Sequence, residues 1–174
     1  MSIITRFDRT ITKAIKSLPD TYRPAATAVS FIGTPWVVVA VSLAGLLSVL
    51  NLGRPAEERV FLYAIAAYLF NTLLKFILRR QRPFGRVIKM FGVRSYSLPS
   101  GHAFGTLIFY GLFAYLDLRY SYSFMSLVIA AILAVCILAV GVSRVYLGVH
   151  YPSDVVAGWL LGAVSLYIVV AAAF

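Results

Sequence analysis

The sequence predicts an all-α integral membrane bundle of about five transmembrane helices, preceded by an amphipathic interfacial helix, in a single domain of residues 1–174. Hydrophobic residues make up 61% of the 174 positions and charged residues only 13%, with a mean hydropathy of +0.88. A chain of this length cannot bury so many apolar side chains in its own interior. The apolar residues also occur in runs close to the roughly 20 residues that a helix needs to cross a bilayer. We therefore expect lipid to surround most of the chain.

Residues 1–23 predict a basic amphipathic helix rather than a signal peptide, because no continuous apolar stretch follows the first charges. Apolar and basic residues both recur at helical spacing here. The apolar ones are Ile4, Phe7, Ile11, Ala14, Ile15 and Leu18, and the basic ones are Arg6, Arg9, Lys13 and Lys16. Such a helix can lie in the headgroup region of a bilayer or pack on the protein's own surface. The pattern favours neither alternative.

The transmembrane core is predicted over residues 24–174, and its five spans follow from the length of the apolar runs. They are expected within Pro24–Gly53, over Val60–Leu78, from Ser100 to just before Asp117, over Ser121–Ser143 and over Val155–Phe174. Five crossings place the N-terminal segment and the loops at 79–99 and 144–153 on one side of the membrane. The loops at 51–59 and 117–123 then lie on the other side, with the C-terminus.

The formal net charge of +10 indicates an anionic partner. Because the basic residues lie beside apolar spans rather than on a soluble face, we expect this partner to be a phosphate-bearing lipid and not a nucleic acid. The N-terminal segment carries five basic residues and the 79–99 loop six, compared with three on the opposite side. The positive-inside rule therefore predicts that the first side faces the cytoplasm.

Three polar segments lie where predicted spans reach this first side, and the first of them is Lys75–Pro83. Lys75 and Arg82 are seven residues apart, which would place them two turns apart on one helical face. A cation inside a span costs about 2–3 kcal/mol at mid-membrane and less near its end. Snorkelling to the interface, or fixing the topology, is the alternative role for Lys75. We expect Pro83 to end the helix.

The second segment is Pro99–His102. Ser100 is a favourable helix N-cap, and Gly101 leaves the backbone unobstructed. Free N–H groups and the helix dipole make such a helix start attractive to anions. His102 would lie in the first turn, facing a bound phosphate. Taken alone, the tetrapeptide is more typical of a plain capped helix with an interfacial histidine.

The third segment contains Arg144, His150 and Asp154. The planar guanidinium of Arg144 matches two phosphate oxygens. His150 and Asp154 are four residues apart, so the carboxylate can hold one ring nitrogen and fix the tautomer. The opposite nitrogen would then be available as a nucleophile. Asp154 also opens the last predicted span, where capping of the helix is an alternative role that can hold alongside the first.

Together the three segments resemble the type 2 phosphatidic acid phosphatase family, which includes vanadium haloperoxidases and bacterial lipid pyrophosphate phosphatases. All three motifs are complete and follow the family's order and spacing. The resemblance extends from Lys75 to the C-terminus, and the string Arg144–Asp154 is typical of the bacterial lipid-phosphatase branch. The combination is specific, because both histidines of the chain occupy motif positions.

The resemblance implies a metal-independent phosphatase, without cofactor, that acts on a lipid phosphate or diphosphate. The residues implied to bind phosphate are Lys75, Arg82, Ser100, Gly101 and Arg144. His150 would attack phosphorus to form a phosphohistidine, Asp154 would orient His150, and His102 would protonate the leaving oxygen and then activate water. The basic side chains would supply the positive charge that a metal supplies elsewhere. We expect Asp154 to be the only acid near the site, too few carboxylates to hold magnesium.

The substrates implied are phosphatidic acid, phosphatidylglycerophosphate or polyprenyl phosphates and diphosphates, with chains that enter laterally between helices. A phosphotransferase, in which a lipid or sugar hydroxyl replaces water, would use the same residues. A small transporter is the non-enzymatic alternative, but it would bury charges deep in several spans. Many members of the family have six spans, and their sites usually face away from the cytoplasm, so this chain departs from the pattern in span number and predicted orientation. The sequence leaves the oligomeric state open.

Overall fold

Seven helices form the protein, described here from a computed structural model of residues 2–85, 88–90 and 93–174. In chain order they are α1 (Ile3–Lys16), α2 (Arg23–Ile32), α3 (Pro35–Asn51), α4 (Pro55–Leu78), α5 (Gly101–Tyr120), α6 (Phe124–Tyr146) and α7 (Pro152–Ala173). Short 3-10 helices cover Asp20–Tyr22 and Pro83–Gly85, and strands β1 (Ile88–Met90) and β2 (Val93–Ser95) form an antiparallel hairpin between α4 and α5. The predicted all-α membrane bundle is confirmed.

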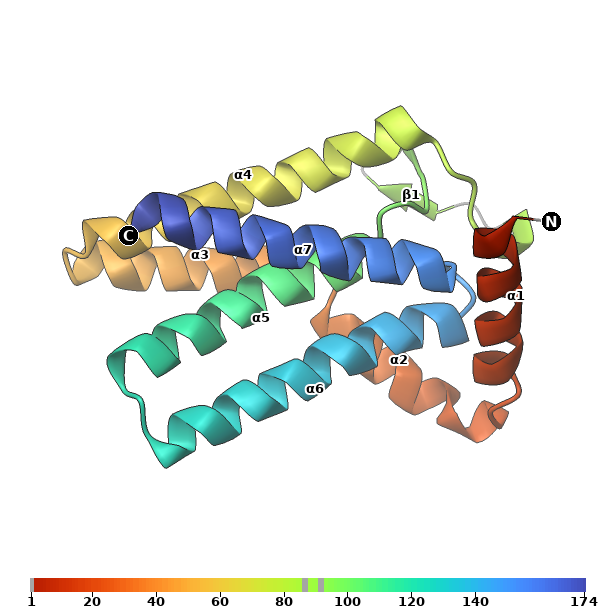
Figure 1. Ribbon diagram of the computed structural model, residues 1–174, viewed down its shortest axis with the longest axis horizontal. Helices are drawn as coiled ribbons and strands as arrows, with labels where there is room; N and C mark the ends of the chain where they lie inside the picture. The colour runs from red at the N-terminus through yellow and green to blue at the C-terminus, as the bar shows by residue number, and fades with distance from the viewer. Residues whose placement is uncertain (1, 86–87, 91–92) are drawn as a thin grey trace.

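Helix α5 occupies the centre of the bundle and contacts α3, α4, α6 and α7 (Figure 1). Its buried side chains meet those of α4 in the main hydrophobic core, which includes Phe61, Ala64, Phe104, Ile108, Phe109 and Leu112. In the described chain, four helical stretches are long and apolar enough to cross a membrane, compared with the five predicted. Helix α5 is not among them. Because other helices surround it, α5 tolerates small and polar residues that a lipid-facing helix would replace with larger apolar ones.

The first predicted span is broken into two helices. Residues Asp20–Asn51 have the length and hydropathy of one span, but Thr34 is extended and Pro35 starts a new helix. Gly33 lets the junction pack closely against α6, because a Cβ there would lie 2.5 Å from Val140 Cγ1. As a result α2 packs against α6, whereas α3 packs against α4 and α5.

Helix α4 ends earlier than the sequence predicted. Arg79 adopts a left-handed conformation with φ of 48°, and its N–H bonds to the Lys75 carbonyl, which terminates the helix at Leu78. The prediction that Lys75 and Arg82 share one helical face is therefore wrong, because Arg82 lies in the loop beyond the helix. Pro83 follows in a short 3-10 helix and does not itself end α4.

Helices α5 and α7 approach each other closely at two glycines of a GxxxG spacing. A Cβ at Gly158 would lie 2.7 Å from the Ser100 carbonyl oxygen, and one at Gly162 would lie 3.2 Å from Leu107 Cβ. Two glycines at this spacing allow the two backbones to approach closely. This approach also brings the starts of the two helices together, and the Ser100 N–H donates to the Asp154 carbonyl at 2.9 Å.

Helix α1 lies across one end of the bundle, beside the ends of α6 and α7 (Figure 1). Ile15 packs against a small core of Ala103, Val145 and Val155. By contrast, Ile3 is 89% exposed and Ile4 59%. The helix thus packs on the protein's own surface, which was one predicted alternative. It also presents an apolar edge outward, which a helix in the headgroup region requires. The turns after α3 and α5 lie at the opposite end of the bundle, together with the C-terminus.

Candidate active site

Six of the eight predicted site residues line one cavity of about 560 Å³ at the end of the bundle that α1 covers. They are Lys75, Arg82, Gly101, His102, Arg144 and His150. Ser100 and Asp154 are fully buried behind the cavity wall. Three separate stretches of chain therefore meet at one place, as the predicted crossings require.

Lys75 reaches the cavity from the last turn of α4. Its side chain is buried, and its ammonium donates a hydrogen bond to the carbonyl of Pro99. A Cβ on Gly101 would lie 3.7 Å from the same ammonium, so Lys75 is adjacent to the start of α5. Among the described residues this carbonyl is its one hydrogen-bond acceptor. A buried cation with one neutral acceptor is poorly compensated, and an anion in the cavity would complete its coordination.

Arg144 projects from the last turn of α6. Its Nη1 donates to the hydroxyl of Ser30, so α2 helps to hold this guanidinium. Its Nε is buried and has no hydrogen-bond partner among the described residues. Buried guanidinium donors are nearly always satisfied, so this one indicates a ligand with acceptor oxygens.

Arg82 is held by the backbone of two loops. Its guanidinium donates to the carbonyls of Ser95, Tyr96 and Val149 at 2.9–3.1 Å. Its Nη1 also lies 3.1 Å from His150 Nε2. Because arginine can only donate, His150 Nε2 must be the acceptor in this contact, and the ring proton lies on Nδ1.

The ring of His150 is buried in the loop between α6 and α7. Burial, followed by the nearby cations Lys75, Arg82 and Arg144, lowers the pKa of His150 well below its usual value. The ring is therefore neutral near pH 7, the protonation state that a nucleophile requires.

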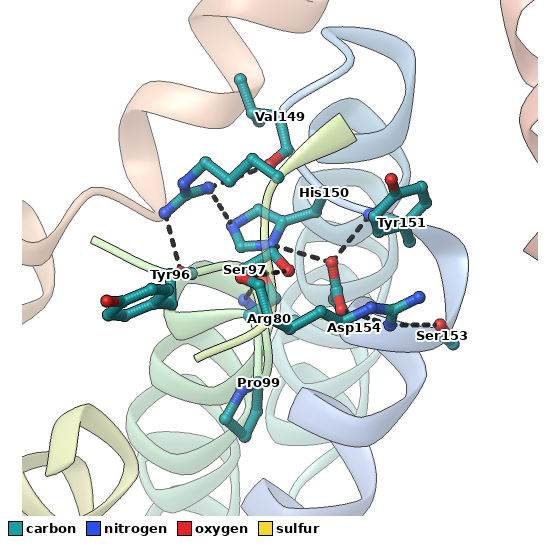
Figure 2. Close-up of polar contacts among 12 residues, drawn as sticks. Arg80, Tyr96, Ser97, Pro99, Val149, His150, Tyr151, Ser153 and Asp154 are labelled. Carbon is teal, nitrogen blue, oxygen red and sulfur yellow. Dashed lines mark hydrogen bonds and ion pairs between the residues drawn. The ribbon is translucent and has the colours of Figure 1, made fainter. Parts of the chain in front are cut away.

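Asp154 lies beside this ring in the first turn of α7. Its Oδ2 is 3.5 Å from His150 Nδ1, an ion-pair distance too long for a hydrogen bond, and it accepts the N–H of Tyr151 at 2.8 Å (Figure 2). The latter contact is the predicted helix cap. Contacts of catalytic histidines are often long without substrate and shorten in the reacting complex.

The start of α5 matches its prediction in part. Ser100 is the N-cap, and its hydroxyl accepts the Ala103 N–H at 3.5 Å. His102 lies in the first turn and lines the cavity together with Gly101. The Ser100 side chain is buried away from the cavity, so its implied contact with phosphate remains a prediction.

Sequence reasoning missed Asp8 and Arg80. Arg80 donates to Asp154 Oδ1 at 2.6 Å and to Asp8 Oδ2 at 2.7 Å. The expectation that Asp154 is the only acid near the site is therefore wrong, because α1 brings Asp8 alongside. One signal could have indicated this residue: Asp8 is the sole acidic residue of an otherwise basic helix.

The fold and site define a multi-pass helical membrane protein with a cationic, histidine-containing site at one end of the bundle. The family model of the PAP2 superfamily matches residues 59–174, which is more than half of the chain. The chain belongs to the PAP2 superfamily, and the resemblance of its three motifs is confirmed.

Two curated relatives illustrate the similarity. The chain is 36% identical over 107 residues to phosphatidylglycerophosphatase B of Bacillus subtilis (58% of this chain, 50% of the relative). It is 30% identical over 129 residues to the undecaprenyl-diphosphatase of Sulfolobus acidocaldarius (72% of this chain, 59% of the relative). The aligned part thus spans about half to three-fifths of these relatives.

Two solved structures have the same fold. The PAP2 type phosphatidylglycerolphosphate phosphatase from Bacillus subtilis superposes with a TM-score of 0.80 at 25% identity, covering 97% of this chain and 85% of that one. Aquifex aeolicus LpxE superposes with a TM-score of 0.69 at 19% identity, covering 98% and 96%, and supports the fold alone.

Proposed function

We propose that this protein is a membrane phosphatase that hydrolyses a lipid phosphate or diphosphate through a phosphohistidine intermediate. The observation that carries the proposal is the single cavity in which Lys75 and Arg144 lie with His102 and His150. Phosphoryl transfer requires positioning and positive charge around the phosphoryl oxygens, and this cavity offers both. The names of the relatives, a phosphatidylglycerophosphatase and an undecaprenyl-diphosphatase, support the same class of substrate.

In the proposed first step, His150 Nε2 attacks phosphorus with its lone pair, and the bond from phosphorus to the leaving oxygen breaks. His102 gives its proton to that oxygen, so the oxygen of the departing lipid alcohol or lipid phosphate carries no negative charge. Asp154 stabilises the positive charge that develops on the His150 ring. When the substrate binds, Arg82 turns its donor from Nε2 to a phosphoryl oxygen, which frees the lone pair for the attack. Lys75 and Arg144 neutralise the other phosphoryl oxygens.

In the second step a water molecule attacks the phosphohistidine. His102, now unprotonated, takes a proton from that water, and the bond from phosphorus to Nε2 breaks. Inorganic phosphate is released, and both histidines return to their starting protonation states. His102 is therefore the general acid in the first step and the general base in the second. His150 is first the nucleophile and then the group that leaves phosphorus.

We propose that the reaction is metal-independent, with the three basic side chains in place of a metal. In the described part of the chain, no group of three or more His, Cys, Asp and Glu side chains is arranged to hold an ion. Asp8 and Asp154, the two acids nearest the site, are both paired with Arg80. This supports a site that binds phosphate through cations alone.

The lipid part of the substrate is proposed to enter between α3 and α4. The cavity continues from the catalytic residues along these two helices. Its apolar lining there includes Trp36, Val39, Leu43, Ile65 and Leu69. A chain in this channel would leave the headgroup at the cationic end, which supports lateral entry from the bilayer.

The proposed function is tested by phosphate release from purified protein with a panel of lipid phosphates and diphosphates in the presence of chelator. We expect at least one lipid to be hydrolysed and chelator to leave the rate unchanged. Loss of activity in chelator would contradict metal independence. Radiolabelled phosphate that appears on another lipid instead of in solution would identify the phosphotransferase alternative.

We propose that the site opens to the cytoplasm, because most basic residues outside the spans lie at its end of the bundle. Single cysteines at the exposed positions Ser17 and Ser121 report the two ends, once Cys136 is replaced by alanine. In intact cells, an impermeant maleimide should label Ser121→Cys but not Ser17→Cys. The reverse pattern would place the site outside.

A further inference from the structure

We propose that Asp8 of α1 and Arg80 are positioning residues that hold Asp154 against the nucleophile His150. This inference rests on the proposed function, and it gives α1 a role in positioning the catalytic residues. The contacts form one continuous chain from the N-terminal helix to the ring of His150. Figure 2 shows its inner part, from His150 through Asp154 to Arg80 and Ser153.

Arg80 bridges the two carboxylates with different nitrogens. Nη1 donates to Asp154 Oδ1 at 2.6 Å, and Nη2 donates to Asp8 Oδ2 at 2.7 Å. The Asp154 side chain is fully buried and that of Asp8 is 6% exposed. Since a buried carboxylate is strongly unfavourable without a partner, loss of Arg80 would leave two charges uncompensated.

The contact with α1 also fixes the first turn of α7. Asp8 Oδ1 accepts the backbone N–H of Ser153 at 2.8 Å, and Asp8 Oδ2 accepts the Ser153 hydroxyl at 2.8 Å. Arg80 Nη1 donates to the same hydroxyl oxygen at 2.8 Å. The carboxylate of α1 therefore holds the residue that immediately precedes Asp154.

Asp154 has little rotational freedom as a result. One carboxylate oxygen is held by Arg80 and the other by the N–H of Tyr151, and the second oxygen is the one beside His150 Nδ1. The Tyr151 ring packs under the Arg80 guanidinium with its centroid 4.4 Å from Cζ. Release of Arg80 would let the carboxylate turn away from Nδ1, so the N–H that Arg82 keeps on that side of the ring would lose its charged neighbour.

Arg80 acts outside the substrate cavity. It lines a separate pocket of about 750 Å³ between α1 and the loop after α4, together with Asp8 and Tyr151. It does not line the cavity that contains Lys75 and the histidines. Its removal should therefore lower kcat and leave KM for the lipid nearly unchanged.

The variants Asp8→Asn, Arg80→Gln and Arg80→Lys test this proposal. We expect kcat to fall by about 10- to 100-fold in the first two, the loss typical of removing a partner that orients a histidine in metal sites. Arg80→Lys keeps the charge but cannot bridge both carboxylates, so its kcat should lie between those of Arg80→Gln and wild type. The controls Asp20→Asn and Arg79→Gln remove the same charges at exposed positions, and they should retain wild-type kcat.

A spectroscopic readout separates positioning from a general loss of structure. The chain has only two histidines, so ¹⁵N ring signals can be assigned with the variant His102→Gln. Because Arg82 donates to Nε2, we expect the Nδ1–H tautomer of His150 to dominate in every variant, and the Nδ1–H proton signal to shift upfield in all three test variants as Asp154 moves away. An unchanged Nδ1–H chemical shift would overturn the proposal, whether or not kcat falls. Since this shift is measured without substrate, a wild type inactive on every lipid would refute the proposed function and leave this test intact.

Discussion

Replacement of His150 by alanine is expected to lower kcat by at least about 10⁴-fold. Losses of this size are seen when the nucleophile is removed from a set of catalytic residues that act together. His150 is buried, its Nε2 accepts from Arg82, and its pKa is held below the usual value by burial and three cations. The loss should appear with every substrate of the panel.

The measurement for His150→Ala combines phosphate release with trapping of the intermediate. Wild-type protein mixed with ³²P-labelled lipid and quenched in alkali, where phosphohistidine is stable, should retain label, and the variant should retain none. His150→Gln is the matched variant, because it keeps a polar side chain without the ring nitrogen, and it should be equally inactive. Turnover by either variant at the wild-type rate would remove His150 as the nucleophile.

Replacement of His102 by alanine is expected to have an effect that depends on the leaving group. For a lipid alcohol, which is a poor leaving group, loss of the general acid should slow formation of the phosphohistidine by about 10²- to 10⁴-fold. For an aryl phosphate, which leaves without protonation, this first step should be nearly as fast as in the wild type. The second step should be slow with either substrate, because His102 also activates water.

Rapid-mixing experiments with nitrophenyl phosphate check this expectation for His102→Ala. A burst of nitrophenol, followed by slow turnover and accumulation of the phosphohistidine, is the expected result. The substitution leaves the backbone carbonyl that accepts the Thr106 hydroxyl, so helix α5 should keep its start. Equal losses in the first step for good and poor leaving groups would show that His102 is not the general acid.

Several parts of the fold could be predicted because they depend on local sequence. Apolar runs of bilayer length predicted the long helices α4, α6 and α7, and Ser100 predicted the start of α5. The predicted crossings brought the three motif segments to one end of the bundle. These features follow from hydrophobicity and capping, which act over one helix at a time.

Other parts could not be predicted because they depend on contacts between distant segments. Helix α5 is enclosed by its neighbours, and its residues therefore lack the hydropathy of a lipid-facing span. The left-handed conformation of Arg79 ends α4 and moves Arg82 into a loop, where the carbonyls of two other segments hold it. No periodicity in the chain signals either feature.

By itself the sequence determined that the chain is a helical membrane protein with the three motifs of its superfamily, because composition and the spacing of polar residues are properties of the chain alone. Only the tertiary structure decided that Asp8, far from every motif, reaches Arg80 and through it Asp154. The physical reason is that a buried ion pair requires complementary partners at about 3 Å. The packing of the helices determines which residues become such partners, and the sequence between the two residues does not predict it.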